Sequence, residues 1–514
     1  MFSKKDIKQI SDKGISLKTI KKQIENFKKG IPFINLYNAA TIKDGIKTIN
    51  DKELKTLPAF YLKEAKKRQI LKFVPASGSA TRMFNHLFYF KEKQKSNKIT
   101  DNKNFDSVHK FFSELKKFSF YNDLKNSMQK NGFDIDKCIS KKDFTTIIDF
   151  LLTEKGLNYS NLPKALLKFH KYNDYSRTSV EEHLVEAANY CKDKNNTAKI
   201  HFTVSKQHLK NFITHINNVK SRYEKMFNIN YDIGFSVQKS STDVIAVDLN
   251  NKPFRNPDAS LLFRPGGHGA LIENLNDIKA DIILTKNIDN VVTDKFKPQT
   301  YLYKKIIIAY LIKIQKKTYK YLKILESSNI NDNKITEILN FIKKYLFIKI
   351  NPYFDNLSKN HKIKYLFDKL NRPIRICGMV ENKGEPGGGP FWVKDVEGNI
   401  SLQIVESSQI DFKNKKQNKI FEKSTHFNPC DFACGVRDYK GNCFDLKKYV
   451  NNSTGFVTIK SKYGKNLKAQ ELPGLWNGAM DRWLTIFVEV PVITFNPVKT
   501  VNDLLKKEHQ SVSG

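Results

Sequence analysis

A run of small residues followed by a single arginine could bind phosphate. The chain reads FVPASGSATRMF at residues 73–84, between an apolar stretch and an aromatic-rich one. Small side chains let backbone N–H groups approach a ligand closely, and Gly78 can adopt a positive φ. A helix beginning near Ser79 or Thr81 would add free N–H groups and the positive end of its dipole, and Arg82 would add a forked cation. The predicted phosphate-binding segment, here called the small-residue loop, comprises Ala76, Ser77, Gly78, Ser79, Ala80 and Thr81. A strand-to-helix turn without a ligand is the alternative.

Three glycines and a strand-end carboxylate form a second candidate site. Residues 263–294 read FRPGGHGALIENLNDIKADIILTKNIDNVVTD. The glycine loop (Gly266, Gly267, His268 and Gly269) would leave a surface without bulky side chains, against which a flat base or ribose could lie. The apolar strand that follows delivers Asp289 at its carboxyl end, where ligands bind in open α/β sheets. A carboxylate there can hold Mg²⁺ against substrate phosphates. Alone, each motif could equally be a glycine turn or a strand-end cap.

A third stretch follows in the same order along the chain. Residues 374–393 read IRICGMVENKGEPGGGPFWV, an apolar strand that ends at Glu381 and continues into a glycine-rich loop. That loop would contact a sugar or a phosphate, or be a mobile connection. Further on, STHFNPCDFAC at 424–434 offers Asp431 or Asn428 as a second metal ligand.

Strands that alternate with helices must position these motifs. Apolar strands are predicted at 70–74, 198–205, 279–290 (running into polar residues) and 374–382, with amphipathic helices between them. This alternation favours an α/β fold with a mainly parallel central sheet covered on both faces. We expect one α/β domain over 70–500, with helical insertions at about 100–195 and 298–368. A helical N-terminal extension would span 1–69, and a C-terminal tail 501–514.

The formal net charge of +37 comes mainly from lysine, because only ten of the 89 basic residues are arginine. The lysines are spread along the chain, whereas nucleic-acid-binding proteins concentrate basic residues on one face and use arginine for base edges. The pattern therefore indicates solvated lysines and argues against nucleic acid, although a positive field would also attract phosphorylated ligands. The longest apolar run, IIIAYLI at 306–312, is too short to span a membrane, and no apolar leader follows Met1. We expect a cytoplasmic protein with no membrane partner.

The first motif resembles the signature loop of sugar nucleotidyltransferases, in which small residues precede G-x-G-T-R. Here the sequence is SGSATR, with Ala80 in place of the second glycine, so Ala80 must have a negative φ. The family also carries a Pro-Lys pair shortly after the arginine, whereas RMFNHLFYFK has no proline here and its first lysine is Lys91. RPGGHGAL and KNIDN resemble the P-x-G-[NH]-G and V-D-N motifs of the UDP-sugar pyrophosphorylase branch.

The resemblance implies a GT-A-like nucleotidyltransferase fold and site. By this likeness the glycine loop lies near the nucleoside, Glu381 contacts the sugar, and Asp289, with Asp431, binds Mg²⁺. Lys286 would replace the missing lysine, three residues before Asp289. The implied reaction joins a nucleoside triphosphate, with UTP expected, to a sugar 1-phosphate, forming a nucleotide sugar and releasing pyrophosphate.

The whole chain also resembles an uncharacterised bacterial family of about 500 residues, through PASGSATRMF, RPGGHGALIENLN, KNIDN and ELPGLWNGAMDRWLTIFVEVP. Two other functions stay open. A GT-A-type glycosyltransferase would use an Asp-x-Asp pair for its metal, and the chain has Asp134 and Asp136. A non-catalytic nucleotide- or nucleic-acid-binding protein would have kept the fold alone. Trp476 and Trp483 are expected in the core.

Overall fold

The computed structural model describes residues 2–95, 103–327, 330–384 and 387–511. The chain forms two compact units that interleave along the sequence. Unit 1 contains residues 1–70, 237–285 and 305–491, and unit 2 contains 71–236, 286–304 and 492–514. Four predicted regions include residues outside those described: the N-terminal extension (residue 1), the helical insertions (100–102 and 328–329), the glycine-rich loop at 385–391 (385–386) and the C-terminal tail (512–514).

Five neighbouring strands make the main sheet of unit 1. Their order is β2 (Ile46–Lys47), β18 (Leu484–Glu489), β11 (Ile374–Glu381), β15 (Phe432–Gly435) and β10 (Ile282–Thr285). The first three pair in parallel, and β15 runs antiparallel to both of its neighbours, so four of the five strands point the same way. Most residues of β10, β11 and β18 are buried, which is why these strands read as continuous apolar runs. The fold is thus mixed α/β with mostly parallel strands, as predicted.

Smaller strand groups surround this sheet. Residues 400–405 belong to a three-stranded antiparallel sheet, and residues 456–462 to a hairpin. The three-stranded sheet consists of β1 (Leu36–Ala39), β12 (Gly389–Lys394) and β13 (Ile400–Val405), and the pairs are β16 (Phe456–Lys462) with β17 (Lys465–Glu471), β8 (Val244–Ile245) with β9 (Phe263–Arg264), and β14 (His426–Phe427) against β11.

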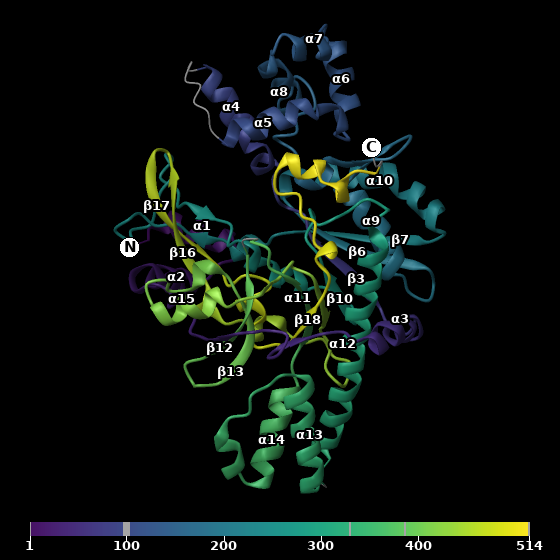
Figure 1. The fold of residues 1–514 in the computed structure, drawn as a ribbon. Helices are drawn as coiled ribbons and strands as arrows, with labels where there is room; N and C mark the ends of the chain where they lie inside the picture. The colour runs from purple at the N-terminus through teal and green to yellow at the C-terminus, as the bar shows by residue number, and fades with distance from the viewer. Residues whose placement is uncertain (1, 96–102, 328–329, 385–386, 512–514) are drawn as a thin grey trace. The chain divides into compact units, whose positions relative to one another are not determined.

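Several helices of unit 1 begin at residues whose side chains cap them. Ser3, Ser16 and Asn50 accept backbone N–H groups at the first turns of α1, α2 and α3. Helices α13 and α14 lie side by side (Figure 1). The helices are α1 (Lys4–Asp12), α2 (Leu17–Lys29), α3 (Asp51–Ala65), α11 (Leu271–Asn276), α13 (Asp332–Tyr345), α14 (Lys359–Leu370), α15 (Lys415–Glu422) and most of α12 (Lys297–Glu326). The predicted N-terminal helices are present, together with strands β1 and β2.

Unit 2 contains three further neighbouring strands and its own helices. Strand β3 (Ile70–Pro75) pairs in parallel with β6 (Thr197–Val204), and β7 (Asn230–Val237) lies beside β6. Helix α9 (Ser179–Tyr190) is almost completely buried. The other helices are α4 (Asn85–Lys95), α5 (Lys103–Ser113), α6 (Tyr121–Lys130), α7 (Ile135–Ser140), α8 (Phe144–Leu152) and α10 (Leu209–Phe227), and β4 (Lys168–Lys171) pairs with β5 (Ser176–Thr178).

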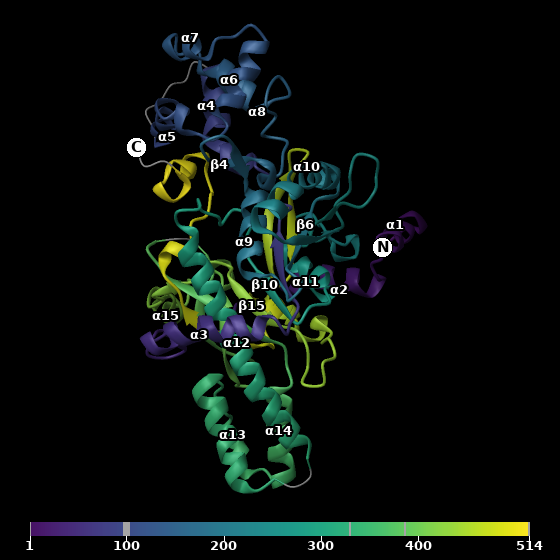
Figure 2. The same cartoon turned by 90° about the vertical axis from the view of Figure 1, so that its right-hand side faces the viewer.

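Helices α4 to α8 share an aromatic-rich core and group together in both views (Figures 1 and 2). Val498, Val501 and Leu504 of the C-terminal segment belong to this core. The predicted tail is therefore packed into unit 2 over its described residues. No helix among the described residues is long and apolar enough to cross a bilayer.

Candidate functional site

The small-residue loop is held from two sides by backbone hydrogen bonds within unit 2. The Ala76 N–H donates to the Thr203 carbonyl of β6 (2.8 Å). On the other side, the Ala80 N–H donates to the Leu162 carbonyl (3.2 Å), and the Lys164 N–H donates to the Gly78 carbonyl (3.1 Å). Ala76 and Ala80 are buried, whereas Ser77, Gly78 and Ser79 are exposed. The loop therefore presents small side chains to solvent on a fixed backbone.

The backbone of the loop agrees with one expectation and corrects another. Ala80 has φ −75°, as a residue in place of glycine requires. Gly78 is not in the positive-φ region, so the expectation of a left-handed glycine there is wrong. The reason is that the loop runs extended beside residues 162–164, where Ser79 forms a bridge with Pro163. A 3₁₀ turn (Thr81–Phe84) then leads into α4, and Arg82 is exposed on that turn.

Lys164 connects this loop to Asp289. Its backbone bonds to Gly78, and its ammonium donates to Asp289 Oδ2 (2.9 Å) and to the Val498 carbonyl (2.7 Å). The side chains of Lys164 and Asp289 are 13% and 20% exposed, so both can be reached from solvent. One residue therefore bridges the two segments in which the sequence predicts phosphate and metal contacts.

The backbone before Asp289 is fixed by α9. The Ile288 carbonyl accepts from the Ser179 hydroxyl and lies 3.1 Å from Nε2 of His183. Beyond it, the Asp289 carbonyl accepts the Val498 N–H (3.1 Å). The position of the carboxylate thus depends on the first turns of α9 and on the C-terminal segment.

A buried charge cluster lies behind these residues. Glu186 of α9 accepts from Lys72 (2.7 Å), Lys286 (2.6 Å) and the Tyr190 hydroxyl (2.7 Å). Burial alone would raise the pKa of Glu186, but the two ammonium groups hold it well below its ordinary value. Burial lowers the pKa of Lys72 to about 8 and lowers that of Lys286, against the attraction of Glu186. Lys286, predicted to contact phosphate, is only 2% exposed, and its ammonium is paired internally.

A second cluster involves Glu182, one turn earlier on α9. Its carboxylate pairs with His170 (2.8 Å), Arg177 (3.3 Å) and Lys297 (2.6 Å). Burial would raise the pKa of Glu182, but Lys297, His170 and Arg177 hold it below its ordinary value. His509 of the C-terminal segment closes the group, 2.9 Å from His170. These pairs join the C-terminal segment to α9.

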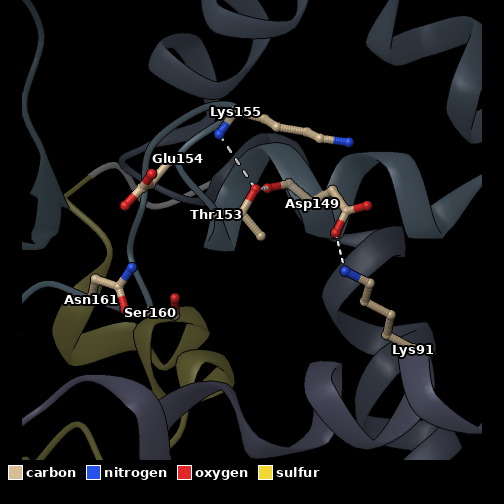
Figure 3. Close-up of a pocket in the computed structure, with 7 residues that line it drawn as sticks. All are labelled: Lys91, Asp149, Thr153, Glu154, Lys155, Ser160 and Asn161. Atoms are coloured by element: carbon tan, nitrogen blue, oxygen red, sulfur yellow. Dashed lines mark hydrogen bonds and ion pairs between the residues drawn. The ribbon is translucent and has the colours of Figure 1, made fainter.

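A pocket of about 480 Å³ opens beside the small-residue loop (Figure 3). The Thr81 hydroxyl donates to the Ser160 carbonyl (3.2 Å), and Ser160 lines the pocket. Lys91, the first lysine after Arg82, is ion-paired with Asp149 here. The lining residues are Lys91, Asp149, Thr153, Glu154, Lys155, Ser160 and Asn161.

The glycine loop belongs to unit 1, where it packs against residues 471–477. A Cβ atom on Gly269 would lie 2.1 Å from the Pro473 carbonyl oxygen, and one on Gly266 would lie 2.6 Å from the Thr242 carbonyl oxygen. Gly267 has φ +76°. Glycine is thus required at these positions by close packing and by backbone conformation. Contact with a nucleoside stays a prediction.

His268 stacks on Trp476, with ring centroids 4.2 Å apart and planes within 9°. The Leu475 N–H donates to Nδ1 of His268 (3.0 Å), so Nε2 carries the proton, 3.7 Å from Oε1 of Glu406. Burial lowers the pKa of His268 to about 4, which keeps the ring neutral. The 471–483 segment therefore supports the glycine loop. Trp483 is buried as expected, whereas Trp476 is only partly buried, against its ring contact with His268.

The remaining predicted residues also lie in unit 1. Glu381 is exposed at the end of β11. Asp431 is buried, and its carbonyl accepts the Gly378 N–H (2.9 Å). Because Asp289 belongs to unit 2, a metal shared by Asp289 and Asp431 stays a prediction. The described residues contain no group of three or more His, Cys, Asp or Glu side chains placed to hold a metal ion.

Asp134 and Asp136, the metal pair required by the glycosyltransferase alternative, have structural partners. Asp134 caps α7 by accepting the N–H groups of Asp136 (2.8 Å) and Lys137 (3.1 Å). Asp136 is ion-paired with Lys116 (3.1 Å). The pair thus stabilises a helix start on the surface of the helical cluster.

A family model described as "Domain of unknown function (DUF4301)" matches residues 3–510. The chain belongs to this family. The predicted end-to-end resemblance to an uncharacterised family is thereby confirmed. A comparison with curated proteins finds no match.

Solved structures similar to this DUF4301 chain include two pyrophosphorylases. A mutant of UDP-glucose pyrophosphorylase from Leishmania major is 12% identical, with 97% of this chain and 77% of that chain covered and a TM-score of 0.44. The uridine diphosphate N-acetylglucosamine pyrophosphorylase from Trypanosoma brucei is 12% identical, with 91% and 72% covered and the same TM-score of 0.44.

The sequence predicts site roles for the small-residue loop, Arg82 and Asp289, and these roles stay predictions; it assigns none to Lys164, which contacts the loop and Asp289. Lys164 stands in NLPKAL, within the predicted helical insertion, where it directly follows Pro163. The chain therefore has a Pro-Lys pair, although it stands far along the sequence from Arg82. Only the fold shows that its main chain and its side chain contact the two predicted motifs.

Proposed function

We propose that this protein is a nucleotidyltransferase with a GT-A-like fold. It transfers a nucleotidyl group from a nucleoside triphosphate, with UTP expected, to a sugar 1-phosphate. The observation that carries the proposal is the link formed by Lys164, which brings the small-residue loop and the carboxylate of Asp289 into one neighbourhood of unit 2. Phosphate-binding amides, a forked cation and a carboxylate are the groups that a triphosphate requires.

Asp289 fits a magnesium ion that arrives with the triphosphate. Mg²⁺ keeps several waters and takes one or two protein carboxylates besides phosphate oxygens. Asp289 offers one partly exposed carboxylate, and the described residues hold no closed metal cage, so phosphate would supply the other ligands. When bound, the ion would neutralise charge on the phosphate oxygens. Asp431 is the proposed second ligand.

The chain's own groups would position the reactants, since this reaction needs no protein nucleophile. An oxygen of the sugar phosphate attacks the α-phosphorus in line, the bond to the β-phosphate oxygen breaks, and pyrophosphate leaves with the electron pair. Backbone amides of the small-residue loop would bind the phosphates, and Arg82 would stabilise the leaving pyrophosphate. His268 in the glycine loop would contact the nucleoside, and Glu381 the sugar. Lys286 would act from behind Asp289, through Glu186.

Pyrophosphate release with a panel of nucleoside triphosphates and sugar 1-phosphates tests the proposal. The wild type should release pyrophosphate with at least one pair of substrates. Arg82→Ala and Asp289→Asn should each lose turnover while keeping the wild-type circular dichroism and melting temperature. Full activity in both variants would show that the site is elsewhere.

The same panel distinguishes the two alternatives. A glycosyltransferase would transfer from or hydrolyse nucleotide sugars without releasing pyrophosphate. A non-catalytic binder would do neither, and its affinity for polynucleotides would fall steeply with salt.

A further inference from the structure

A second pocket lies entirely in unit 1, and no predicted motif or resemblance assigns a ligand to it. Its volume of about 310 Å³ is at the lower end of the range of small-molecule sites. Three cations and one carboxylate line it together with an amide and a phenol: Arg372, Lys448, Arg482, Asp368, Asn371 and Tyr449. The lining is therefore positive overall.

The sheet of unit 1 brings the two arginines of this pocket together. Strands β11 and β18 pair in parallel, with Ile374 opposite Leu484. Arg372 and Arg482 each stand two residues before these partners, and the Leu484 N–H donates to the Pro373 carbonyl (2.9 Å), which extends the pairing towards them. The amino ends of two neighbouring strands thus place both arginines at one edge of the sheet.

A short 3₁₀ turn (Leu446–Tyr449) adds the lysine of the pocket. The Arg482 N–H donates to the Tyr449 carbonyl (3.3 Å), so the turn that carries Lys448 is joined to the start of β18. Lys448 and Arg482 are exposed, and Arg372 is half-buried. A ligand can therefore reach all three cations from solvent.

The three cations have no acidic partner. Among the residues that the structure describes, no carboxylate lies within ion-pair distance of Arg372, Lys448 or Arg482. Nε of Arg372 donates to the main-chain carbonyl of Asp368 (2.9 Å), which orients the guanidinium group without neutralising it. Four other arginines of the chain each pair with a carboxylate: Arg68, Arg177, Arg255 and Arg437.

The electrostatics of the pocket favour a bound anion with more than one charge. Burial lowers the pKa of Arg372, and the charge of Arg482 lowers it further, against the attraction of Tyr449 and Asp368. An anion between the two guanidinium groups would remove this repulsion, and a phosphate group offers several oxygens to forked donors. The side-chain oxygen of Asn371 is buried and has no hydrogen-bond partner among the described residues, so it would accept from a hydroxyl group of a ligand.

We propose that this pocket is a second phosphate-binding site, in which Arg372, Lys448 and Arg482 hold the phosphate group of a small ligand, either a phosphomonoester or free phosphate. The site is distinct from the proposed triphosphate site. Arg372 precedes β11 and Glu381 ends it, so about 30 Å of strand separates the pocket from the predicted sugar contact. The proposal rests on unit 1 alone and does not depend on the proposed function.

Calorimetric titration with glycerol 3-phosphate and with inorganic phosphate, both in EDTA, tests the site. We expect Arg482→Gln to weaken the binding of both probes about tenfold, since a hydrogen bond to a charged group is worth about one order of magnitude. Lys447→Gln is the matched control, because Lys447 is the exposed neighbour of Lys448 and its replacement removes the same charge. It should change neither affinity by more than about twofold, and the same holds for Arg82→Ala at the other proposed site.

The two probes also distinguish the sources of the phosphate group. Tighter binding of glycerol 3-phosphate identifies a phosphomonoester as the ligand, and equal affinities identify free phosphate. Unchanged affinities in Arg482→Gln, or a loss of all binding in Arg82→Ala alone, would overturn the proposal.

Arginine labelling of the wild type keeps the proposal testable if Arg482→Gln does not fold. Phenylglyoxal modifies exposed arginines, and both Arg482 and Arg222, which lies in unit 2, are exposed. Saturating glycerol 3-phosphate should slow the labelling of Arg482 several-fold, as mapped by peptide mass spectrometry, and leave that of Arg222 unchanged. Equal rates at Arg482 with and without the probe would refute the site.

Discussion

Replacing Glu186 by glutamine should destabilise unit 2 strongly, because it leaves Lys72 and Lys286 without their carboxylate. All three side chains are almost inaccessible to solvent, and the two ammonium groups lie 2.7 Å and 2.6 Å from the Glu186 oxygens. Breaking a buried pair by removing one partner costs about 3–5 kcal/mol. We expect Glu186→Gln to lose about this much free energy of unfolding at pH 6, measured by urea denaturation. Glu154→Gln, an exposed glutamate in the same unit, should change it by less than about 0.5 kcal/mol.

The pH dependence gives this prediction a second, independent readout. In the wild type the folded pKa of Lys72 is about 8, below its ordinary 10.5. The unfolded state therefore binds more protons between these values, and this contribution to stability rises with pH over that window. Without Glu186 the folded pKa of Lys72 falls further, so the variant begins to gain stability at a lower pH than the wild type. Its deficit should shrink by up to about 1.4 kcal/mol per pH unit towards pH 8 and then become constant. A deficit below about 1 kcal/mol, or one that does not change between pH 6 and 8, would refute the assigned charge states.

Three further outcomes follow from single positions. Gly78→Ala should leave the melting temperature unchanged, because an added Cβ meets no atom within 4 Å and φ is not positive. The same variant should bind tripolyphosphate more weakly in calorimetry, because the added methyl group would keep phosphate away from this backbone. Unchanged binding would place the ligand elsewhere. Gly269→Ala should destabilise the protein by several kcal/mol in chemical denaturation, since its Cβ would lie 2.1 Å from the Pro473 oxygen; a neutral effect would contradict the packing of the glycine loop. Burial lowers the pKa of His509 to about 3 in the folded state. Below pH 6.5 the unfolded state therefore binds one more proton at this histidine than the folded state does, and the free energy of unfolding should fall by about 2 kcal/mol between pH 7 and 5. His509→Gln should show a smaller slope over this range, and equal slopes would exclude His509 as the source.

The strands could be predicted from the sequence, because strands that are buried on both faces consist of consecutive apolar residues. The loop after β3 could be predicted because a tight connection requires small residues. The location of Asp289 after a strand could be predicted in the same way. The buried state of α9 could not. SVEEHLVEAANY reads as a helix with a solvated acidic face, yet Glu181, Glu182 and Glu186 are all buried. Their partners come from segments far apart in the chain, and no local pattern records such pairs.

One signal of the buried cluster was present in the sequence. Lys72 interrupts the apolar run ILKFV, and Lys286 follows the apolar run IILT directly. A lysine inside a strand that is otherwise buried requires a carboxylate nearby, since an isolated buried ammonium is too costly. The two lysines therefore predict a shared acidic partner on a covering helix, although not which glutamate supplies it.

The arrangement of α9 also explains why these charges lie behind the proposed site. Ser179 and His183 approach the Ile288 carbonyl, while Glu186 on the same helix binds Lys286, two residues before Ile288. Helix α9 thus contacts both a main-chain carbonyl and a side chain of the residues before Asp289. The buried pairs of α9 therefore hold the residues before Asp289 independently of the Lys164–Asp289 contact.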